Sequence, residues 1–129
     1  MPIKEFDTEL NLRRLSNNAR LRGKRFENLV FSFFPIIKKE KDGSMFDGKV
    51  KGKFVEIKSC EVRINKKKER NGRVKFSKRQ IEYITKYPNK VIVILVLHKR
   101  GRVYKIYQIS GDKIPPQRQI SWRRLVEAN

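Results

Sequence analysis

Apolar residues recur at the three- and four-residue spacing of a helix face in the segment 19–34. Pro35 follows directly, and a proline inside a helix removes a backbone hydrogen bond and clashes with the preceding turn. The spacing therefore predicts one amphipathic helix over residues 19–34. Its apolar positions are Leu21, Phe26, Leu29, Val30, Phe33 and Phe34.

A second helix and several strands follow from the same kind of pattern further along the chain. Residues 77–87 carry apolar side chains at helical spacing and end before Pro88. Residues 91–97 are aliphatic without interruption, which is typical of a central strand covered on both faces. We predict further strands over residues 36–39 and 102–109. Helices that alternate with strands in this way indicate a single α/β domain with a mixed central sheet flanked by helices.

A tight hairpin is predicted between residues 47 and 58. Lys51 and Gly52 lie between two apolar-rich runs and suit a two-residue turn. The register of that turn pairs Val50 with Lys53, Lys49 with Phe54, Gly48 with Val55 and Asp47 with Glu56.

The predicted hairpin sets two carboxylates opposite each other. Like charges at directly opposed positions destabilise a sheet unless a cation lies between them, and a divalent metal ion would do so. Side chains alternate along a strand, so Lys58, two residues after Glu56, returns to the face that carries Asp47 and Glu56.

The charge of the chain points to a polyanionic partner. The 129 residues include 33 Lys and Arg against 13 Asp and Glu, a formal net charge of +20 at pH 7. Nucleic acid is the first candidate for such a chain. No stretch approaches the roughly 20 apolar residues of a membrane-spanning helix. We therefore expect a cytoplasmic protein that binds no membrane.

The chain is long enough for one domain over residues 1–129. We assign residues 1–18 to an N-terminal extension and residues 65–73, which have no apolar residue to anchor them, to a mobile basic loop. A single cysteine, Cys60, and a single histidine, His98, exclude a Cys/His zinc cluster within one chain. The chemistry must then rest on carboxylates and lysine, and Cys60 is read as a small apolar strand residue.

Asp47 followed by Glu56-Ile57-Lys58 resembles the paired-strand motif of the PD-(D/E)XK nuclease superfamily. Glu27, on the first helix, matches an additional acidic residue of many members. Ser44, shortly before the acid, and Gln80, early in the second helix, are similar to features of the archaeal Holliday-junction resolvases. Phe46 stands where the motif has its proline, and the interval between the two acids is short.

The resemblance implies a restriction-endonuclease-like core and a Mg²⁺-dependent DNA endonuclease, with Mn²⁺ able to substitute. Mg²⁺ prefers oxygen ligands, which would come from Asp47, Glu56, the backbone carbonyl of Ile57 and Glu27. Lys58 would orient or help to deprotonate the attacking water, and Ser44 would donate a hydrogen bond to phosphate.

Each of these residues also has an ordinary structural interpretation. The E-X-K triplet could be a cross-strand salt bridge, because a chain rich in lysine produces such triplets by chance. Glu27 could be a solvated helix residue that pairs with a neighbouring Arg or Lys. Gln80 could close a capping box with Ser77, although its place on the apolar stripe of the second helix would aim it inward.

Basic residues in two adjoining segments are the predicted nucleic-acid contacts. Neutralising phosphates releases counterions and strengthens binding, but such contacts read no sequence. A branched DNA is therefore a more natural target than a defined base string, and cutting two symmetric strands would ask for a homodimer. The alternatives are a sequence-specific restriction or homing endonuclease on the same core, a non-catalytic basic nucleic-acid-binding protein, and a ribosome-associated basic protein. The predicted contacts are Lys66, Lys67, Lys68, Arg70, Arg73, Lys75, Lys78, Arg79 and Gln80.

Overall fold

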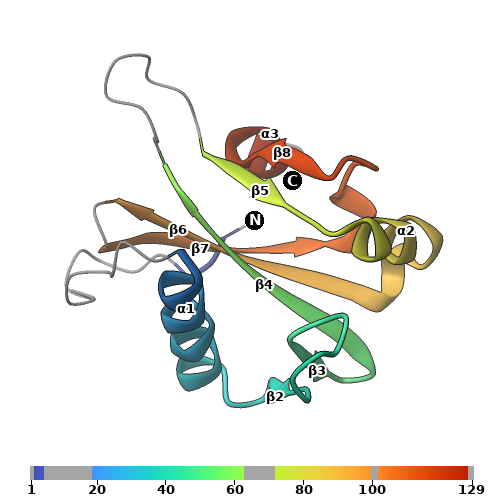
Figure 1. The fold of residues 1–129 in the computed structure, drawn as a ribbon, viewed down its shortest axis with the longest axis horizontal. Helices are drawn as coiled ribbons and strands as arrows, with labels where there is room; N and C mark the ends of the chain where they lie inside the picture. Colours follow the sequence, from blue (N-terminus) through green and yellow to red (C-terminus); the bar gives the residue numbers. More distant parts are fainter. Residues whose placement is uncertain (1, 5–18, 63–71, 100–101, 128–129) are drawn as a thin grey trace.

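A six-stranded mixed sheet forms the centre of the molecule, shown in Figure 1. The computed structural model describes residues 2–4, 19–62, 72–99 and 102–127. The strand order is β1-β7-β6-β4-β3-β2; β4 and β6 run parallel, and all other neighbours are antiparallel. The strands are β1 (Pro2–Lys4), β2 (Lys38–Lys39), β3 (Gly48–Val50), β4 (Lys53–Glu61), β6 (Val91–Lys99) and β7 (Arg102–Ser110).

Helix α1 (Ala19–Phe33) covers one face of the sheet. Its residues Phe26 and Val30 are fully buried and belong to one core cluster with Val55 and Ile57, two alternate residues of β4. Burying a side chain of this size contributes about 1.5–3 kcal/mol each, which outweighs the weak helix propensity of the aromatic and β-branched positions. The helix is therefore held by its packing on the sheet.

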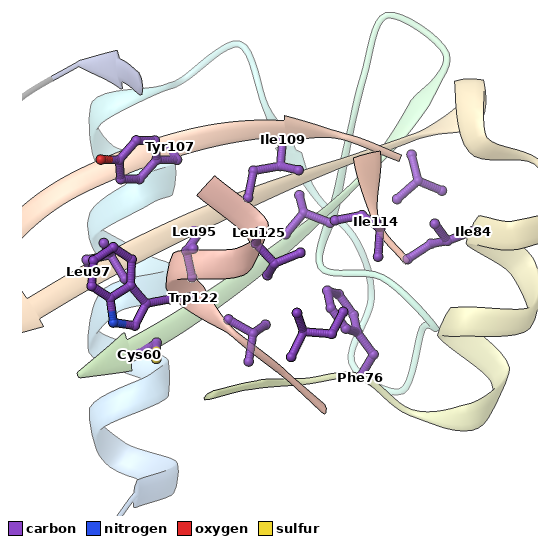
Figure 2. Close-up of a cluster of buried hydrophobic side chains, with 14 of the residues drawn as sticks. Cys60, Phe76, Ile84, Leu95, Leu97, Tyr107, Ile109, Ile114, Trp122 and Leu125 are labelled. Atoms are coloured by element: carbon purple, nitrogen blue, oxygen red, sulfur yellow. The ribbon is translucent and has the colours of Figure 1, made fainter. Parts of the chain in front are cut away.

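The opposite face is covered by elements from the second half of the chain. Helix α2 (Lys78–Lys86), a two-stranded sheet of β5 (Arg73–Lys75) and β8 (Gln119–Ser121), and helix α3 (Trp122–Glu127) lie on it, with the 3₁₀ turns η1 (Pro88–Lys90) and η2 (Gly111–Lys113). Figure 2 shows Trp122 and Leu125 of α3 lying among side chains of the sheet such as Leu95 and Cys60. The indole nitrogen of Trp122 donates a hydrogen bond of 2.9 Å to the Val62 carbonyl, so its only polar group is satisfied where it is buried.

Strand β6 is the central strand, as its uninterrupted aliphatic sequence predicts. It pairs with β4 on one side and β7 on the other, and α1 and α2 lie on opposite faces. Val93, Leu95 and Val96 are fully buried, so both faces of this strand are covered over its middle part. That arrangement explains why no polar residue alternates with the apolar ones.

The hairpin forms in the predicted register. Gly48 pairs with Val55, Lys49 with Phe54 and Val50 with Lys53. Lys51 and Gly52 form the turn with φ of 49° and 76°, both in the left-handed region that a type I′ turn requires. Glycine adopts this conformation without a Cβ penalty, and lysine does so at some cost.

The structure confirms some of the other sequence predictions and corrects others. The α/β class with a mixed sheet flanked by helices is confirmed, as are both helices to within a residue of their ends. The strand predicted over residues 36–39 is shorter, since only Lys38 and Lys39 pair with β3. Pro2–Lys4 forms an edge strand with β7 inside the segment assigned to an extension. Residues 5–18 lie outside the described part.

One boundary of the basic loop is corrected. Arg73 belongs to β5, and the carbonyl of Gly72 accepts a hydrogen bond from Trp122, so the two residues that end the predicted loop are held in the fold. Val74, which follows them directly, is buried and supplies the apolar anchor that the run of charges conceals. Residues 65–71 lie outside the described residues. No helix in the described ranges is long and apolar enough to cross a membrane.

Replacing Gly52 by alanine should destabilise the hairpin. A Cβ at this position meets no atom within 4 Å, so the cost comes only from the left-handed backbone, about 1 kcal/mol. Lys51→Asn should change the free energy of unfolding in the opposite direction, because asparagine tolerates this conformation better than lysine. Urea unfolding of both variants measures the difference, and equal stability of Gly52→Ala and the parent would contradict the turn.

Candidate functional site

Asp47 is held over β4 by backbone hydrogen bonds. One of its carboxylate oxygens, Oδ2, accepts a 2.8 Å hydrogen bond from the backbone N–H of Ile57, and its carbonyl accepts one of 2.9 Å from Glu40. The Asp47 carboxylate therefore reaches from the residue before β3 to β4, the strand that carries Glu56. The paired register ends at Gly48 and Val55, and the next residues, Asp47 and Glu56, lie close enough to interact, as predicted.

Glu56 is a buried carboxyl group whose two oxygens have different surroundings. The residue is only 5% exposed. Its Oε2 lies 3.1 Å from the Lys58 ammonium and accepts a 2.6 Å hydrogen bond from the Gln80 amide. Its Oε1 is buried and has no hydrogen-bond partner among the described residues. Such an oxygen is costly in a folded protein unless a proton or a cation occupies the site.

Burial raises the pKa of Glu56 to about 8, because the charged form loses its hydration. The ammonium of Lys58 opposes this effect, whereas the charge of Asp47 raises the pKa further. Protonated Glu56 can also hydrogen-bond to the Asp47 carboxylate, which favours the neutral form again. Without a metal ion, Glu56 therefore favours its protonated form beside the Asp47 carboxylate. A divalent cation between them would take the place of that proton.

Lys58 occupies the predicted face of β4 and contacts two groups that fix its ammonium. Besides Glu56 Oε2, the Nζ atom lies 5.2 Å from the centroid of the Phe76 ring, within range of a cation–π interaction. The side chain is 22% exposed, so it reaches from the interior to the surface. This ammonium can meet a ligand without leaving the buried acid.

Gln80 satisfies both interpretations that the sequence left open. It closes a capping box, since its Oε1 accepts from the Ser77 N–H and its own N–H donates to the Ser77 hydroxyl. Its amide nitrogen then donates to Glu56 and, over 2.8 Å, to the Met45 carbonyl. Because the amide oxygen is used by the cap, the nitrogen must face the acids. The first turn of α2 is thereby joined to the site.

Glu27 lies on α1, on the other side of the sheet from α2. Burial raises its pKa, and the negative charge of Asp47 raises it further, while Lys39 and Lys24 lower it. The pKa of Glu27 therefore depends on the charge of Asp47. It does not join Asp47 and Glu56 in a cluster, because no three His, Cys, Asp or Glu side chains of the described residues are close enough to hold a metal ion.

The Ile57 backbone lies at the edge of β4 that faces Asp47. In a strand, the N–H and C=O of one residue point to the same edge, and the Ile57 N–H donates to Asp47. The carbonyl is therefore directed to the same side, beyond the last residue of β4 that β3 pairs with. This orientation is compatible with the predicted role of that carbonyl as a third oxygen ligand.

The remaining predicted residues lie around the acids or outside the described part. Ser44 is exposed in the turn before β3 and lines a pocket with Phe54 and Tyr83; no hydrogen bond joins it to either acid in the described residues. Lys66, Lys67, Lys68 and Arg70 lie outside the described residues. Arg73, Lys75, Lys78 and Arg79 are exposed on β5 and the first turn of α2.

Two groups of the site, the Met45 carbonyl and the Phe76 ring, are not predicted from the sequence. The Met45 carbonyl orients Gln80 from 35 positions earlier in the chain, and Phe76 lies beside Lys58 because β4 and the start of α2 pack together. Cys60 is buried as predicted, and burial raises its pKa to about 12, which makes it a poor nucleophile.

Comparison of the chain with protein-family models, curated proteins and solved structures finds no match.

The metal-free protein should lose stability as the pH rises from about 5 to about 8. The folded state binds the Glu56 proton up to pH about 8, whereas the unfolded chain releases it near 4.5, so the folded state holds more protons in this window. The stabilisation that comes from the bound Glu56 proton is fully present below pH 4.5 and is lost above pH about 8. Glu56→Gln should remove this slope and stabilise the protein at pH 8 by a few kcal/mol at most, to order of magnitude.

Thermal or urea unfolding in a metal chelator measures this dependence. Glu82→Gln is the matched control, because Glu82 is an exposed acid on α2. Its pH dependence should equal that of the parent protein. If Glu56→Gln shows the same slope as the parent between pH 5 and pH 8, Glu56 does not hold a proton in the folded state.

Proposed function

We propose that this protein is a metal-dependent DNA endonuclease of the PD-(D/E)XK kind. One observation carries the proposal: the buried Oε1 of Glu56 lacks a hydrogen-bond donor among the described residues, beside the Asp47 carboxylate and two residues from Lys58. Two acids and one amine in this arrangement can bind a divalent cation and act on a phosphodiester bound to it.

The order of the elements supports the same proposal. Helix α1 precedes three antiparallel strands, β2, β3 and β4, and α2 then leads to β6, which runs parallel to β4. The PD-(D/E)XK superfamily resembled by the motif has a core of a helix, a three-strand meander, a second helix and a further strand. A restriction-endonuclease-like core is thus part of what we propose.

The proposed metal is Mg²⁺, with Mn²⁺ as a substitute. Asp47, Glu56 and the Ile57 carbonyl supply the hard oxygen donors that these ions prefer. A bound ion would polarise the phosphate and lower the pKa of a coordinated water. Glu27 forms no metal-holding group of three with these acids in the described residues, and its proposed contribution is through a water or through its charge.

Lys58 and Gln80 have separate tasks in this proposal. Lys58 Nζ, held at 3.1 Å from Glu56, would donate hydrogen bonds to the attacking water and to the phosphoryl oxygens on which negative charge develops. Gln80 holds Glu56 Oε2, which leaves Oε1 for a cation. The first turn of α2 brings Lys78 and Arg79 next to these groups, where a helix N-terminus favours an anion.

The broader parts of the proposal rest on charge and on the resemblance. An excess of Lys and Arg suits DNA, and a branched DNA with a homodimeric enzyme is the form we propose. The cytoplasmic location stays a prediction from composition. The sequence-specific nuclease on the same core, the ribosome-associated protein and the non-catalytic binding protein remain alternatives. The Lys58–Glu56 contact agrees with a plain salt bridge as well, so only an activity measurement separates catalysis from binding.

Lys58→Ala should abolish Mg²⁺-dependent cleavage of DNA while leaving DNA binding nearly unchanged. The loss should be at least about 100-fold, the size expected when a group that assists proton transfer is removed. Branched and linear duplexes, each incubated with and without Mg²⁺, provide the assay. Lys53→Ala is the matched control, because Lys53 is an exposed lysine on the same strand and its removal changes the net charge equally.

Two results would contradict the nuclease. One is the absence of cleavage of any DNA by the parent protein with Mg²⁺ or Mn²⁺. The other is cleavage that survives Lys58→Ala at the level of Lys53→Ala, which would indicate a contaminating enzyme. Fragments that recur at one sequence in plasmid DNA would favour the sequence-specific alternative.

The double variant Lys78→Ala/Arg79→Ala should weaken DNA binding and its dependence on salt. For every phosphate that the protein no longer neutralises, the slope of log affinity against log salt should fall by about 0.9, because fewer counterions are released. Arg123→Ala/Arg124→Ala, an exposed pair on α3, removes the same charge as a control. Equal slopes for the two double variants would show that α2 does not face the DNA.

A further inference from the structure

A pocket of about 300 Å³ lies beside the acids, between β3, β4 and α2. Its size is at the lower end of small-ligand pockets, which is enough for one flat ring system. Aromatic side chains form its walls, and a charged pair and a hydroxyl lie among its lining groups. The lining includes Glu40, Ser44, Phe46, Lys49, Phe54 and Tyr83.

The aromatic walls form one packed cluster. The Phe46 ring is buried and lies 5.3 Å from Phe54 and 5.5 Å from Tyr83, measured between centroids. Phe54 and Tyr83 meet edge to face at 5.6 Å and are only partly buried. Tyr87 packs against Tyr83 and Lys49 lies over Phe54, so a planar ligand would stack on the parts of the two rings that stay exposed.

The polar lining groups suit the edge of a nucleobase. Lys49 Nζ lies 3.2 Å from the Glu40 carboxylate and 5.1 Å from the centroid of the Phe54 ring. A carboxylate accepts hydrogen bonds from the exocyclic amino group of a base such as cytosine. The exposed Ser44 hydroxyl can donate or accept.

The pocket and the proposed catalytic centre share bonded neighbours. Glu40 donates its N–H to the carbonyl of Asp47, and Phe46 directly precedes Asp47. The Gln80 amide nitrogen bonds both the carbonyl of Met45, another lining residue, and Glu56. A nucleotide whose phosphate lies at the acids would thus have its base next to this pocket.

We propose that the pocket receives one unpaired DNA base next to the phosphate that is cut. This inference rests on the proposed nuclease function and adds to it the feature of the substrate that is selected. Bases inside a duplex are stacked and cannot enter, so the pocket takes only a base that is unpaired or can leave the stack at low cost. Selection of branched or interrupted DNA would follow without reading a sequence, and the net charge of +20 complements the DNA backbone.

The test measures binding without divalent metal, so that it does not depend on cleavage. The two probes are a duplex with one unpaired deoxycytidine and the fully paired duplex of the same length. Base stacking on aromatic side chains predicts that the parent protein binds the first about 5- to 150-fold more tightly. Tyr83→Leu should reduce this preference, whereas Tyr83→Phe, which keeps the ring, should retain it.

A cross-linking measurement needs no variant and therefore does not depend on whether Tyr83→Leu folds. The unpaired base is replaced by 5-iododeoxycytidine, the complex is irradiated, and the attached peptide is identified by mass spectrometry. We expect attachment at Phe54, Tyr83 or Met45. Attachment confined to other segments, equal affinity for the two duplexes, or occupation of the pocket by free cytidine without any change in DNA affinity would each overturn the proposal.

Failure of this inference can be told apart from failure of the nuclease. Equal affinity for the two duplexes together with Lys58-dependent cleavage would remove the base pocket and leave the nuclease. Selective binding and cross-linking at Tyr83 without cleavage would keep the base pocket on a non-catalytic binding protein.

Discussion

The hydrogen bond from the Ile57 N–H to Asp47 is the interaction on which the site depends. It places one carboxylate across the edge of the strand that carries the other, and it can form only if the hairpin turns at Lys51 and Gly52 in the observed register. A shift of one residue would send Glu56 and Lys58 to the α1 face, into the apolar core positions that Val55 and Ile57 now occupy. The turn, the register and the acid pair are therefore one structural unit.

Keeping Glu56 buried costs stability, and the surrounding fold offsets that cost. Lys58 and Gln80 satisfy one of its oxygens, and the aromatic and aliphatic side chains on both faces of the sheet hold β4 in place around it. The other oxygen is left for a proton or a cation. An ordinary surface salt bridge would need neither the burial nor the inward amide, so the arrangement is better suited to binding a ligand than to stabilising the fold.

Features that depend on local pattern could be predicted from the sequence. The apolar period over α1, the unbroken aliphatic run of β6 and the left-handed turn at Gly52 each specify their structure within a few residues, and the last of these also places Asp47 beside Glu56. Lys58 follows because strand side chains alternate.

Features that depend on distant contacts could not be predicted. Strand β5 has a single buried residue, Val74, between two charges, and it forms only because β8 pairs with it about 45 positions later. The double role of Gln80 depends on the Met45 carbonyl and on the packing of α2 against β4. The distance between Glu27 and the acid pair depends on how α1 lies on the sheet, and no periodicity encodes that.

Calorimetric titration of the parent protein with Mg²⁺ or Mn²⁺ in two buffers of different ionisation enthalpy tests the central claim most directly. If the acid pair is a cation site that holds a proton when empty, heat should appear for one ion per chain, the apparent enthalpy should depend on the buffer at pH 7, and Asp47→Asn should abolish the binding. Binding that is absent in the parent protein, or that persists unchanged in Asp47→Asn, would contradict the account.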